Sequence, residues 1–171
     1  AGTAVGTATT DKFVGNVSVA VDWNMDGKMD IIKLANSGQS WLYTNDGMPG
    51  SASFTASKFS TATSTQVSGA ARLDYDWDGA QDLLIFRQNG SVILERNTNT
   101  VAPGTAMHLK IVDSEGINAF FGNTVQLYNS AGQLVASQIL NAQSGMGIND
   151  SSSLISFYGL DASETYHAVL V

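Results

Sequence analysis

A nine-residue acidic pattern occurs twice in the chain, and it constrains the possible folds more than any other feature. Residues 22–30 read DWNMDGKMD and residues 74–82 read DYDWDGAQD, so Asp or Asn stands at positions 1, 3, 5 and 9 and glycine at position 6. The two stretches hold seven of the fifteen acidic residues. Because like charges at this spacing repel one another, the pattern predicts that each loop encloses a cation.

The acidic loops belong to a longer internal repeat with an offset of 52 residues between Asp22 and Asp74. Residues 18–45 align with residues 69–97, and each copy reads as a strand, the loop, an apolar strand, a turn and a returning strand. This order predicts a three-stranded antiparallel meander made twice, with the repeat length typical of propeller blades. The Ser/Thr-rich segment 47–69 is expected to be either a loop or a fourth, edge strand.

The last third of the chain follows a different pattern but is also strand-like. After a connector at 97–104, apolar runs bounded by Gly and small polar residues continue to the end, with a hairpin turn expected at Asn129–Gly132. No segment shows a sustained helical period. We expect an all-β fold in which two blade-like antiparallel β-meanders with Ca-binding loops pack with a C-terminal β-unit into one compact sandwich-like domain.

The predicted boundaries place the two repeats in residues 1–100, at about 11–62 and 63–100, and the C-terminal β-unit in residues 105–171. Two repeats do not close a propeller ring, so the alternative is a fragment of a larger propeller. The compact arrangement is favoured because missing blades would leave an open sheet edge, which promotes aggregation.

Oxygen ligands at alternating loop positions select a hard cation, and a flexible loop favours Ca²⁺ over Mg²⁺. We expect at least two Ca²⁺ ions, held by side chains at positions 1, 3, 5 and 9 and by the backbone carbonyl at position 7. The ligands would be Asp22, Asn24, Asp26, Lys28 and Asp30 in the first loop, and Asp74, Asp76, Asp78, Ala80 and Asp82 in the second. A further ion at Asp46, Asp113, Glu115 or Asp150 stays open.

Two other interpretations of the loops are weaker. An EF-hand requires Glu at position 12 and flanking helices, whereas Lys33 and Ile85 stand there and the following segments are strand-like. Asp-rich solvated turns would also use Asp and Gly, but the full pattern recurs at matching places of a repeat.

Composition excludes several function classes. The chain has no cysteine, which excludes disulfides and zinc thiolate sites, and its eight Lys and Arg residues are not clustered, which argues against nucleic acid. No apolar run is long enough for membrane insertion. The start lacks the features of a signal peptide, so we expect a segment of a larger protein. His108 and His167 lie in strand-like runs and no G-x-S-x-G motif occurs, so we expect no enzyme.

The loops and their flanks resemble the calcium-binding repeats called FG-GAP or VCBS, which occur in integrin α propellers and many secreted bacterial proteins. In that family the ligands are structural, which implies the same role for the ten residues named above. The last third resembles the ASPIC/UnbV domain of the cartilage acidic protein family, through EGINAFFGNTVQLY with Asn118 and Gly122, through SGMGINDSSSLISFYGL, and through the final TYHAVLV. Asp161 departs from that pattern.

The resemblance and the polar, Ser- and Thr-rich composition together imply a calcium-dependent recognition or adhesion module of a secreted or cell-surface bacterial protein. Its partners would be an extracellular protein, peptide or glycan, and neighbouring domains of a larger chain. The alternatives are a purely structural, calcium-stiffened spacer and an accessory, non-catalytic part of a larger enzyme. Trp23 and Tyr75 at loop position 2 are expected to pack against their own blades, while Trp77 is a candidate exposed platform for a ligand.

Overall fold

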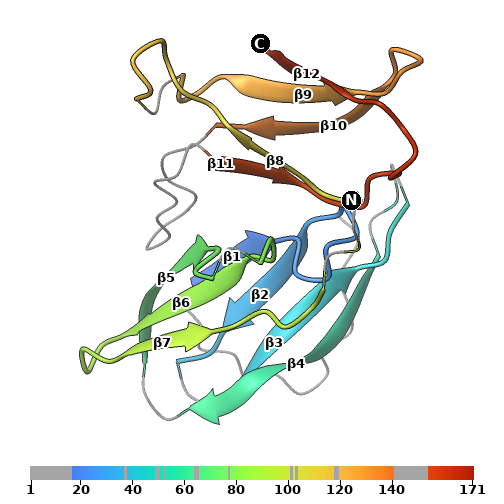
Figure 1. Cartoon of the computed structure of the whole chain (residues 1–171). Coiled ribbons are helices and arrows are strands. Elements are labelled where there is room, and N and C mark those ends of the chain that lie inside the picture. The colour runs from blue at the N-terminus through green and yellow to red at the C-terminus, as the bar shows by residue number, and fades with distance from the viewer. Residues whose placement is uncertain are drawn as a thin grey trace.

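Alternating apolar residues build the first sheet of the protein. The computed structural model describes residues 17–36, 38–48, 51, 53–63, 66–76, 78–100, 102, 104–117, 120–140 and 154–171. The first repeat forms an antiparallel sheet of order β1-β2-β3-β4, made of β1 (Val17–Val21), β2 (Asp30–Leu34), β3 (Gly38–Asn45) and β4 (Phe54–Thr63) (Figure 1). The predicted meander is confirmed, and the Ser/Thr-rich segment supplies the fourth strand.

The second repeat forms a smaller sheet with the same strand order. Strands β5 (Val67–Leu73), β6 (Asp82–Arg87) and β7 (Val92–Glu95) pair antiparallel in the order β5-β6-β7. Leu83 and Ile85 on β6 are buried, as Ile32 and Leu34 are on β2. The second predicted meander is therefore confirmed as well.

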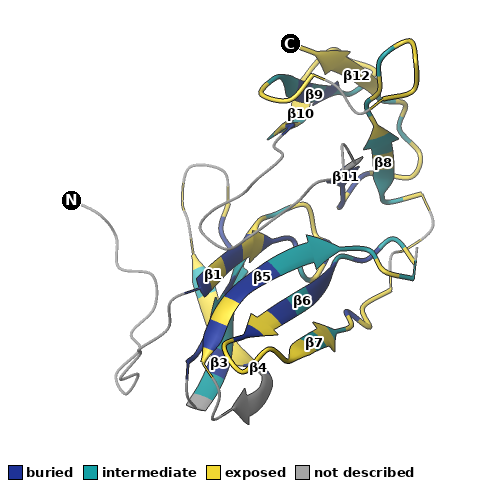
Figure 2. Ribbon diagram, turned by 90° about the vertical axis from the view of Figure 1, so that its left-hand side faces the viewer, coloured by how far each residue is buried: buried dark blue, intermediate teal, exposed yellow. Residues whose placement is uncertain are grey.

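The two repeat sheets enclose one shared hydrophobic core. Its buried residues come from both repeats and are Val17, Val19, Val21, Ile32, Leu34, Phe59, Val67, Ala70, Leu83 and Ile85. Along β1, β5 and β6, buried residues are interspersed with more exposed ones (Figure 2), as expected when one face of a sheet packs inward. The Arg72 side chain donates a hydrogen bond from Nη1 to the Ala20 carbonyl at 3.0 Å, which connects β5 to β1.

The C-terminal third forms a separate pair of sheets around its own core. One sheet has the order β10-β9-β12, with β9 (Thr124–Tyr128), β10 (Leu134–Ile139) and β12 (His167–Leu170). The other pairs β8 (Met107–Lys110) with β11 (Leu154–Phe157). The core between them consists of Val125, Leu127, Leu140, Ile155, Phe157 and Leu160.

The predicted hairpin between β9 and β10 is present. The Asn129 amide donates to the Gln133 carbonyl at 3.0 Å, the Gly132 amide donates to the Asn129 carbonyl at 2.9 Å, and Gly132 has φ of 74°. An L-residue with a side chain rarely adopts this φ, so glycine at 132 suits the turn.

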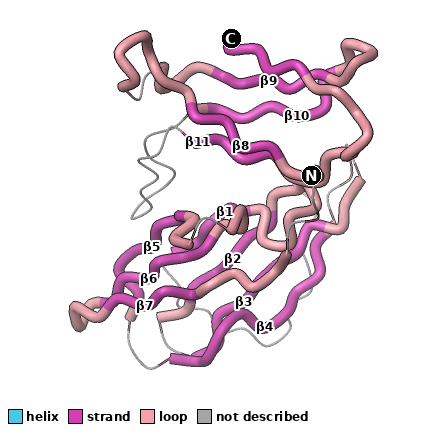
Figure 3. The backbone as a smooth tube through the Cα atoms, in the orientation of Figure 1, coloured by secondary structure: helices cyan, strands magenta, loops and turns pink. Residues whose placement is uncertain are grey.

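The C-terminal unit lies at one end of the repeat sheets, next to the loops that connect β1 to β2 and β5 to β6 (Figure 3). The described residues contain strands and no helix, which confirms the predicted all-β class. No helix in those parts of the chain is long and apolar enough to cross a membrane. The predicted domain boundaries stay a prediction. Because the C-terminal unit lies at this end of the repeat sheets, the two acidic loops lie between the repeats and the C-terminal unit.

Candidate metal centre

The first acidic loop is wound around the carboxylate of Asp22. Asp22 directly follows β1. Its Oδ1 accepts the Asp26 amide at 3.1 Å, and its Oδ2 accepts the Gly27 amide at 2.8 Å. Asp26 in turn accepts the Lys28 amide at 2.9 Å. Gly27 has φ of 89°, which favours glycine at position 6. Asp22 and Asp26, at positions 1 and 5, thus hold the loop in one tight turn by accepting its backbone amides.

The second loop repeats these hydrogen bonds. Asp74 Oδ1 accepts the Asp78 amide at 3.2 Å, Asp74 Oδ2 accepts the Gly79 amide at 3.0 Å, and Asp78 Oδ1 accepts the Ala80 amide at 2.9 Å. Gly79 has φ of 91°. The sequence repeat therefore extends to individual backbone contacts of the loops.

The position-9 carboxylates, Asp30 and Asp82, are completely buried. In each loop, Oδ2 accepts the amide of position 2, and Oδ1 accepts the amide of a residue at or just beyond the end of the returning strand. The donors are Trp23 at 2.9 Å and Asn45 at 2.8 Å for Asp30, and Tyr75 at 3.0 Å and Asn97 at 2.8 Å for Asp82. These carboxylates fasten the loops to the sheets. Their role as metal ligands, and that of the Lys28 and Ala80 carbonyls, stays a prediction.

The second loop brings three carboxylates together. Asp74, Asp76 and Asp78 each offer an oxygen, and these oxygens lie within 4.8 Å of one another. Asp82 is not part of this group. Asp76 Oδ1 is buried and has no hydrogen-bond partner. A buried polar atom without a partner is costly, and a hard cation would satisfy it, so the donor set fits Ca²⁺.

Burial affects the acidity of the first loop. The pKa of Asp22 is raised to about 6, mainly by burial, against the opposing hydrogen bonds from the Gly27 and Asp26 amides. The neighbouring charges of Asp26 and Asp30 raise it further. The Lys28 ammonium lies 3.8 Å from Asp26 Oδ2. In this loop Asn24 stands where the second loop has Asp76, and its Nδ2 donates to Asp26 Oδ2 at 3.2 Å.

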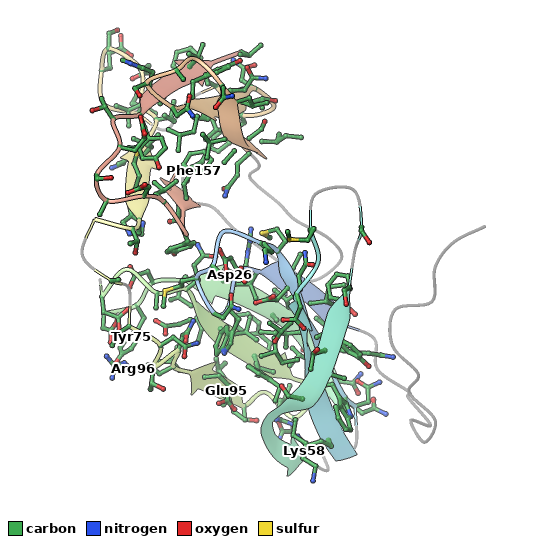
Figure 4. All side chains as sticks on the ribbon, turned by 90° about the vertical axis from the view of Figure 1, so that its right-hand side faces the viewer. Asp26, Lys58, Tyr75, Glu95, Arg96 and Phe157 are labelled. Carbon is green, nitrogen blue, oxygen red and sulfur yellow. The ribbon has the colours of Figure 1, made fainter. Side chains whose placement is uncertain are left out.

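Arg96 contacts the second loop, and sequence reasoning missed it. Its Nε lies 2.6 Å from Asp76 Oδ2 and its Nη2 lies 3.2 Å from Asp78 Oδ2. Figure 4 labels Arg96 close to Tyr75. The hydrogen bond to Asp76 and the charges of both aspartates raise the pKa of Arg96 above its usual value. The internal repeat gave no signal for this contact, because the residue equivalent to Arg96 in the first repeat is Thr44, which is uncharged.

The turn after β11 packs against both loops, and this contact was also missed. Met25 of the first loop, Ala80 of the second and Tyr158 form a small buried cluster. The Tyr158 hydroxyl donates to the Gly79 carbonyl at 2.8 Å, and burial is the main reason why the pKa of Tyr158 is raised to about 12. In Figure 4 Asp26 lies at the end of the repeats that faces the C-terminal unit.

Two glycines allow the backbones of the first loop and the C-terminal turn to approach closely. A Cβ at Gly27 would lie 2.8 Å from the Tyr158 carbonyl oxygen, and a Cβ at Gly159 would overlap the Asp26 carbonyl oxygen. The FYGL sequence therefore supplies two residues, Tyr158 and Gly159, that join the C-terminal unit to the first loop.

The structure agrees with some of the remaining predictions for single aromatic and histidine residues, and disagrees with another. Trp23 packs against the shared core and edge-on against Phe59, with ring centroids 5.1 Å apart, as predicted. The same prediction is wrong for Tyr75, which is 49% exposed. His108 Nδ1 lies 2.9 Å from Ser156 Oγ on the neighbouring strand. Trp77, Asn118 and Asp150 lie outside the described residues.

Comparison with known families supports the repeat assignment. Residues 9–85 match the family model described as FG-GAP-like repeat, and this range includes both acidic loops. The match ends before the C-terminal unit, so the resemblance of that unit to ASPIC/UnbV domains stays a prediction. No curated protein matches the chain.

Proposed function

We propose that the chain is a non-enzymatic, calcium-dependent recognition module of a secreted or cell-surface bacterial protein, in which two bound Ca²⁺ ions fix the loops that present a surface to a protein, peptide or glycan. The observation that carries the calcium part is the doubled loop, in which the same hydrogen bonds direct carboxylates inward at Asp22 and at Asp74. The FG-GAP-like match over residues 9–85 supports the same assignment. An ASPIC/UnbV-like identity of the C-terminal unit belongs to this proposal.

The residues that would hold the ions are those expected from the spacing. The first ion would be bound by the side chains of Asp22, Asn24, Asp26 and Asp30 and the Lys28 carbonyl, and the second by those of Asp74, Asp76, Asp78 and Asp82 and the Ala80 carbonyl. Bound Ca²⁺ supplies positive charge and accepts oxygen ligands. The chain's own part is to hold these oxygens in place by backbone hydrogen bonds from Gly27 and Gly79.

The charge of the loops determines how calcium affects stability. Without an ion, the folded protein keeps Asp74, Asp76 and Asp78 within a few ångströms of one another, a repulsion that the unfolded chain relieves. An ion that binds only the folded protein adds about 4 kcal/mol per site at a concentration about a thousand times its dissociation constant. Two sites together would rival the net stability of about 5–15 kcal/mol expected for a domain.

A calcium-stiffened structural spacer is the second candidate, and one observation favours it. Both loops contact the turn at Tyr158 and Gly159, so bound ions would stiffen the junction between the repeats and the C-terminal unit. An accessory, non-catalytic part of a larger enzyme is a third possibility. It would use bound ions to stiffen the loops in the same way.

Calorimetric titration of the calcium-free chain with Ca²⁺ tests the metal assignment. We expect two sites, of which Asp26→Ala removes one and Asp78→Ala the other, and no comparable affinity for Zn²⁺, because the chain has no thiolate. A chain that binds no calcium would contradict the assignment.

Binding to arrays of glycans and extracellular peptides, with and without EGTA, separates the two functional candidates. A saturable interaction that EGTA abolishes, at a temperature where the calcium-free chain stays folded, supports recognition. Calcium binding without any such interaction supports the spacer.

A further inference from the structure

We propose that Arg96 is a built-in counter-ion of the second loop. It competes with calcium for Asp76 and Asp78, and it therefore lowers the calcium affinity of the second site below that of the same ligands without the arginine. The inference rests on the proposed calcium binding. It concerns how the chain sets the affinity of one site, and it predicts a difference between two loops whose backbones have the same hydrogen bonds.

The geometry of Arg96 places a positive charge on two of the predicted ligands. Its guanidinium spans Asp76 Oδ2 at 2.6 Å and Asp78 Oδ2 at 3.2 Å, so it bridges positions 3 and 5 of the loop. Together with Asp74, these two residues form the close carboxylate group. The Arg96 side chain is 50% exposed, so it can leave the loop without opening the core.

Comparison of the two loops shows what the arginine replaces. In the first loop, position 3 is the neutral Asn24, whose amide donates to Asp26 Oδ2 at 3.2 Å. In the second loop, position 3 is Asp76, which has no proton to donate when ionised. The equivalent oxygen, on Asp78, receives its hydrogen bond from Arg96, also at 3.2 Å.

The extra negative charge at position 3 of the second loop is met directly by Arg96. The cation of the first loop, Lys28, stands at position 7 and lies 3.8 Å from Asp26 Oδ2. The residue equivalent to Arg96 in the first repeat is Thr44, which is uncharged. The pair of Asp76 and Arg96 therefore stands where the first repeat has Asn24 and Thr44. Neutral partners in one copy and a charge pair in the other indicate that the arginine balances the added aspartate.

This balance has opposite effects on the calcium-free and calcium-bound forms. Without calcium, Arg96 offsets repulsion between Asp76 and Asp78 and helps to keep the loop folded. A calcium ion would either displace the guanidinium or bind beside it through Asp76 Oδ1, which is buried and has no hydrogen-bond partner. Displacement breaks the contacts of Arg96 with Asp76 and Asp78, and binding beside the guanidinium places a divalent ion next to a unit positive charge. At a separation of about 5 Å in a water-like medium, Coulomb's law gives a loss of affinity of about tenfold.

The test uses the full chain and two readouts, the calcium affinity by calorimetry and the melting temperature in EGTA. The affinity is measured in an Asp26→Ala background, in which only the second site is expected to bind. Arg96→Gln should raise the affinity of that site by about tenfold and should lower the melting temperature in EGTA. Arg96→Lys keeps the charge and should leave the affinity within about threefold of the starting protein.

Lys58→Gln is the control for net charge, measured in the same Asp26→Ala background. Lys58 is exposed on β4 and lies at the opposite end of the repeats from Asp26 (Figure 4), so removal of its charge should change the affinity of the second site by less than about threefold. The gain from Arg96→Gln should also shrink in high sodium chloride, because screening weakens the repulsion between the two cations.

The outcomes separate the two proposals. Two-site binding by the unmodified chain, with an unchanged or lower affinity in Arg96→Gln, would overturn the role of Arg96 and leave the calcium assignment intact; a lower affinity would mean that Arg96 orients Asp76 for the ion. Failure of the unmodified chain to bind calcium would overturn the proposed function, and the competition with it.

Discussion

Replacement of Gly159 by Ala tests the contact between the C-terminal turn and the first loop. Gly159 has φ of 67°, and an added Cβ would overlap the Asp26 carbonyl oxygen. The matched control is Gly116→Ala, because Gly116 has φ of 80° but nothing within 4 Å of the position of its Cβ. Both variants incur the left-handed backbone strain, and only Gly159→Ala also forces two backbones apart.

The expected losses follow from these two contributions. Left-handed strain costs about 1–2 kcal/mol in each variant. If the turn lifts away from the loop, the hydrogen bond from Tyr158 to Gly79 is also lost, together with the burial of the Tyr158 ring. The lost hydrogen bond leaves the Gly79 carbonyl without its partner, which adds about 1–3 kcal/mol. Gly159→Ala should therefore lose about twice as much stability as Gly116→Ala.

Thermal unfolding in the presence of calcium measures this difference. For a chain of this size, about 1 kcal/mol corresponds to a shift of about 2–4 °C, so we expect a decrease of about 5 °C for Gly116→Ala and about 10 °C for Gly159→Ala. Gly27→Ala should resemble Gly159→Ala, because its Cβ would lie 2.8 Å from the Tyr158 carbonyl oxygen. Equal losses for Gly159→Ala and Gly116→Ala would refute the close approach of the turn and the loop.

Further predictions concern the ions, the pH and the tyrosine. Chelation by EGTA should lower the melting temperature by many degrees, and sodium chloride at matched ionic strength should not restore it; an unchanged melting curve would contradict the metal sites. Since the pKa of Asp22 is about 6 without calcium, a proton competes with the ion, and calorimetry should show an affinity of the first site about tenfold lower at pH 5 than at pH 7.5. The sign reverses for the stability of the calcium-free chain: the folded state holds this proton more tightly than the unfolded chain, so the contribution of Asp22 to the free energy of unfolding should increase as the pH falls from about 6 towards 4. Tyr158→Phe should cost about 1–3 kcal/mol in urea unfolding through loss of the hydrogen bond to Gly79; a loss below about 0.5 kcal/mol would show that this bond contributes little.

The strands were largely predictable because they depend on patterns that are local in sequence. Alternation of apolar residues and the turn residues between them located β1, β2 and β3 and their counterparts β5, β6 and β7. The sequence does not decide whether the segment that forms β4 is a strand, because a Ser/Thr-rich segment has little alternation to distinguish an edge strand from a loop. Its pairing with β3 provides what the local sequence does not.

The candidate site was predictable as far as the nine-residue spacing reached. The spacing predicted that the side chains of Asp22 and Asp74, at position 1, turn into their loops, and each carboxylate accepts two amides of its own loop. It did not reveal that Asp30 and Asp82 each accept backbone amides from two directions, since one donor lies 15 residues further along the chain. Arg96 was missed for the same reason, because the contact depends on how β7 returns to the loop.

The contact between Tyr158 and Gly79 also has a consequence for the order in which the molecule is assembled. Tyr158 lies 79 residues after Gly79, so both acidic loops leave the ribosome well before the turn that covers them exists. If the repeats fold during synthesis, only their own hydrogen bonds or a captured ion hold the loops in shape until the turn docks. Because docking of the turn closes such a long stretch of chain, it is a non-local step of the kind that slows folding. A nascent chain that stalls before residue 158 would expose the loops without their cover.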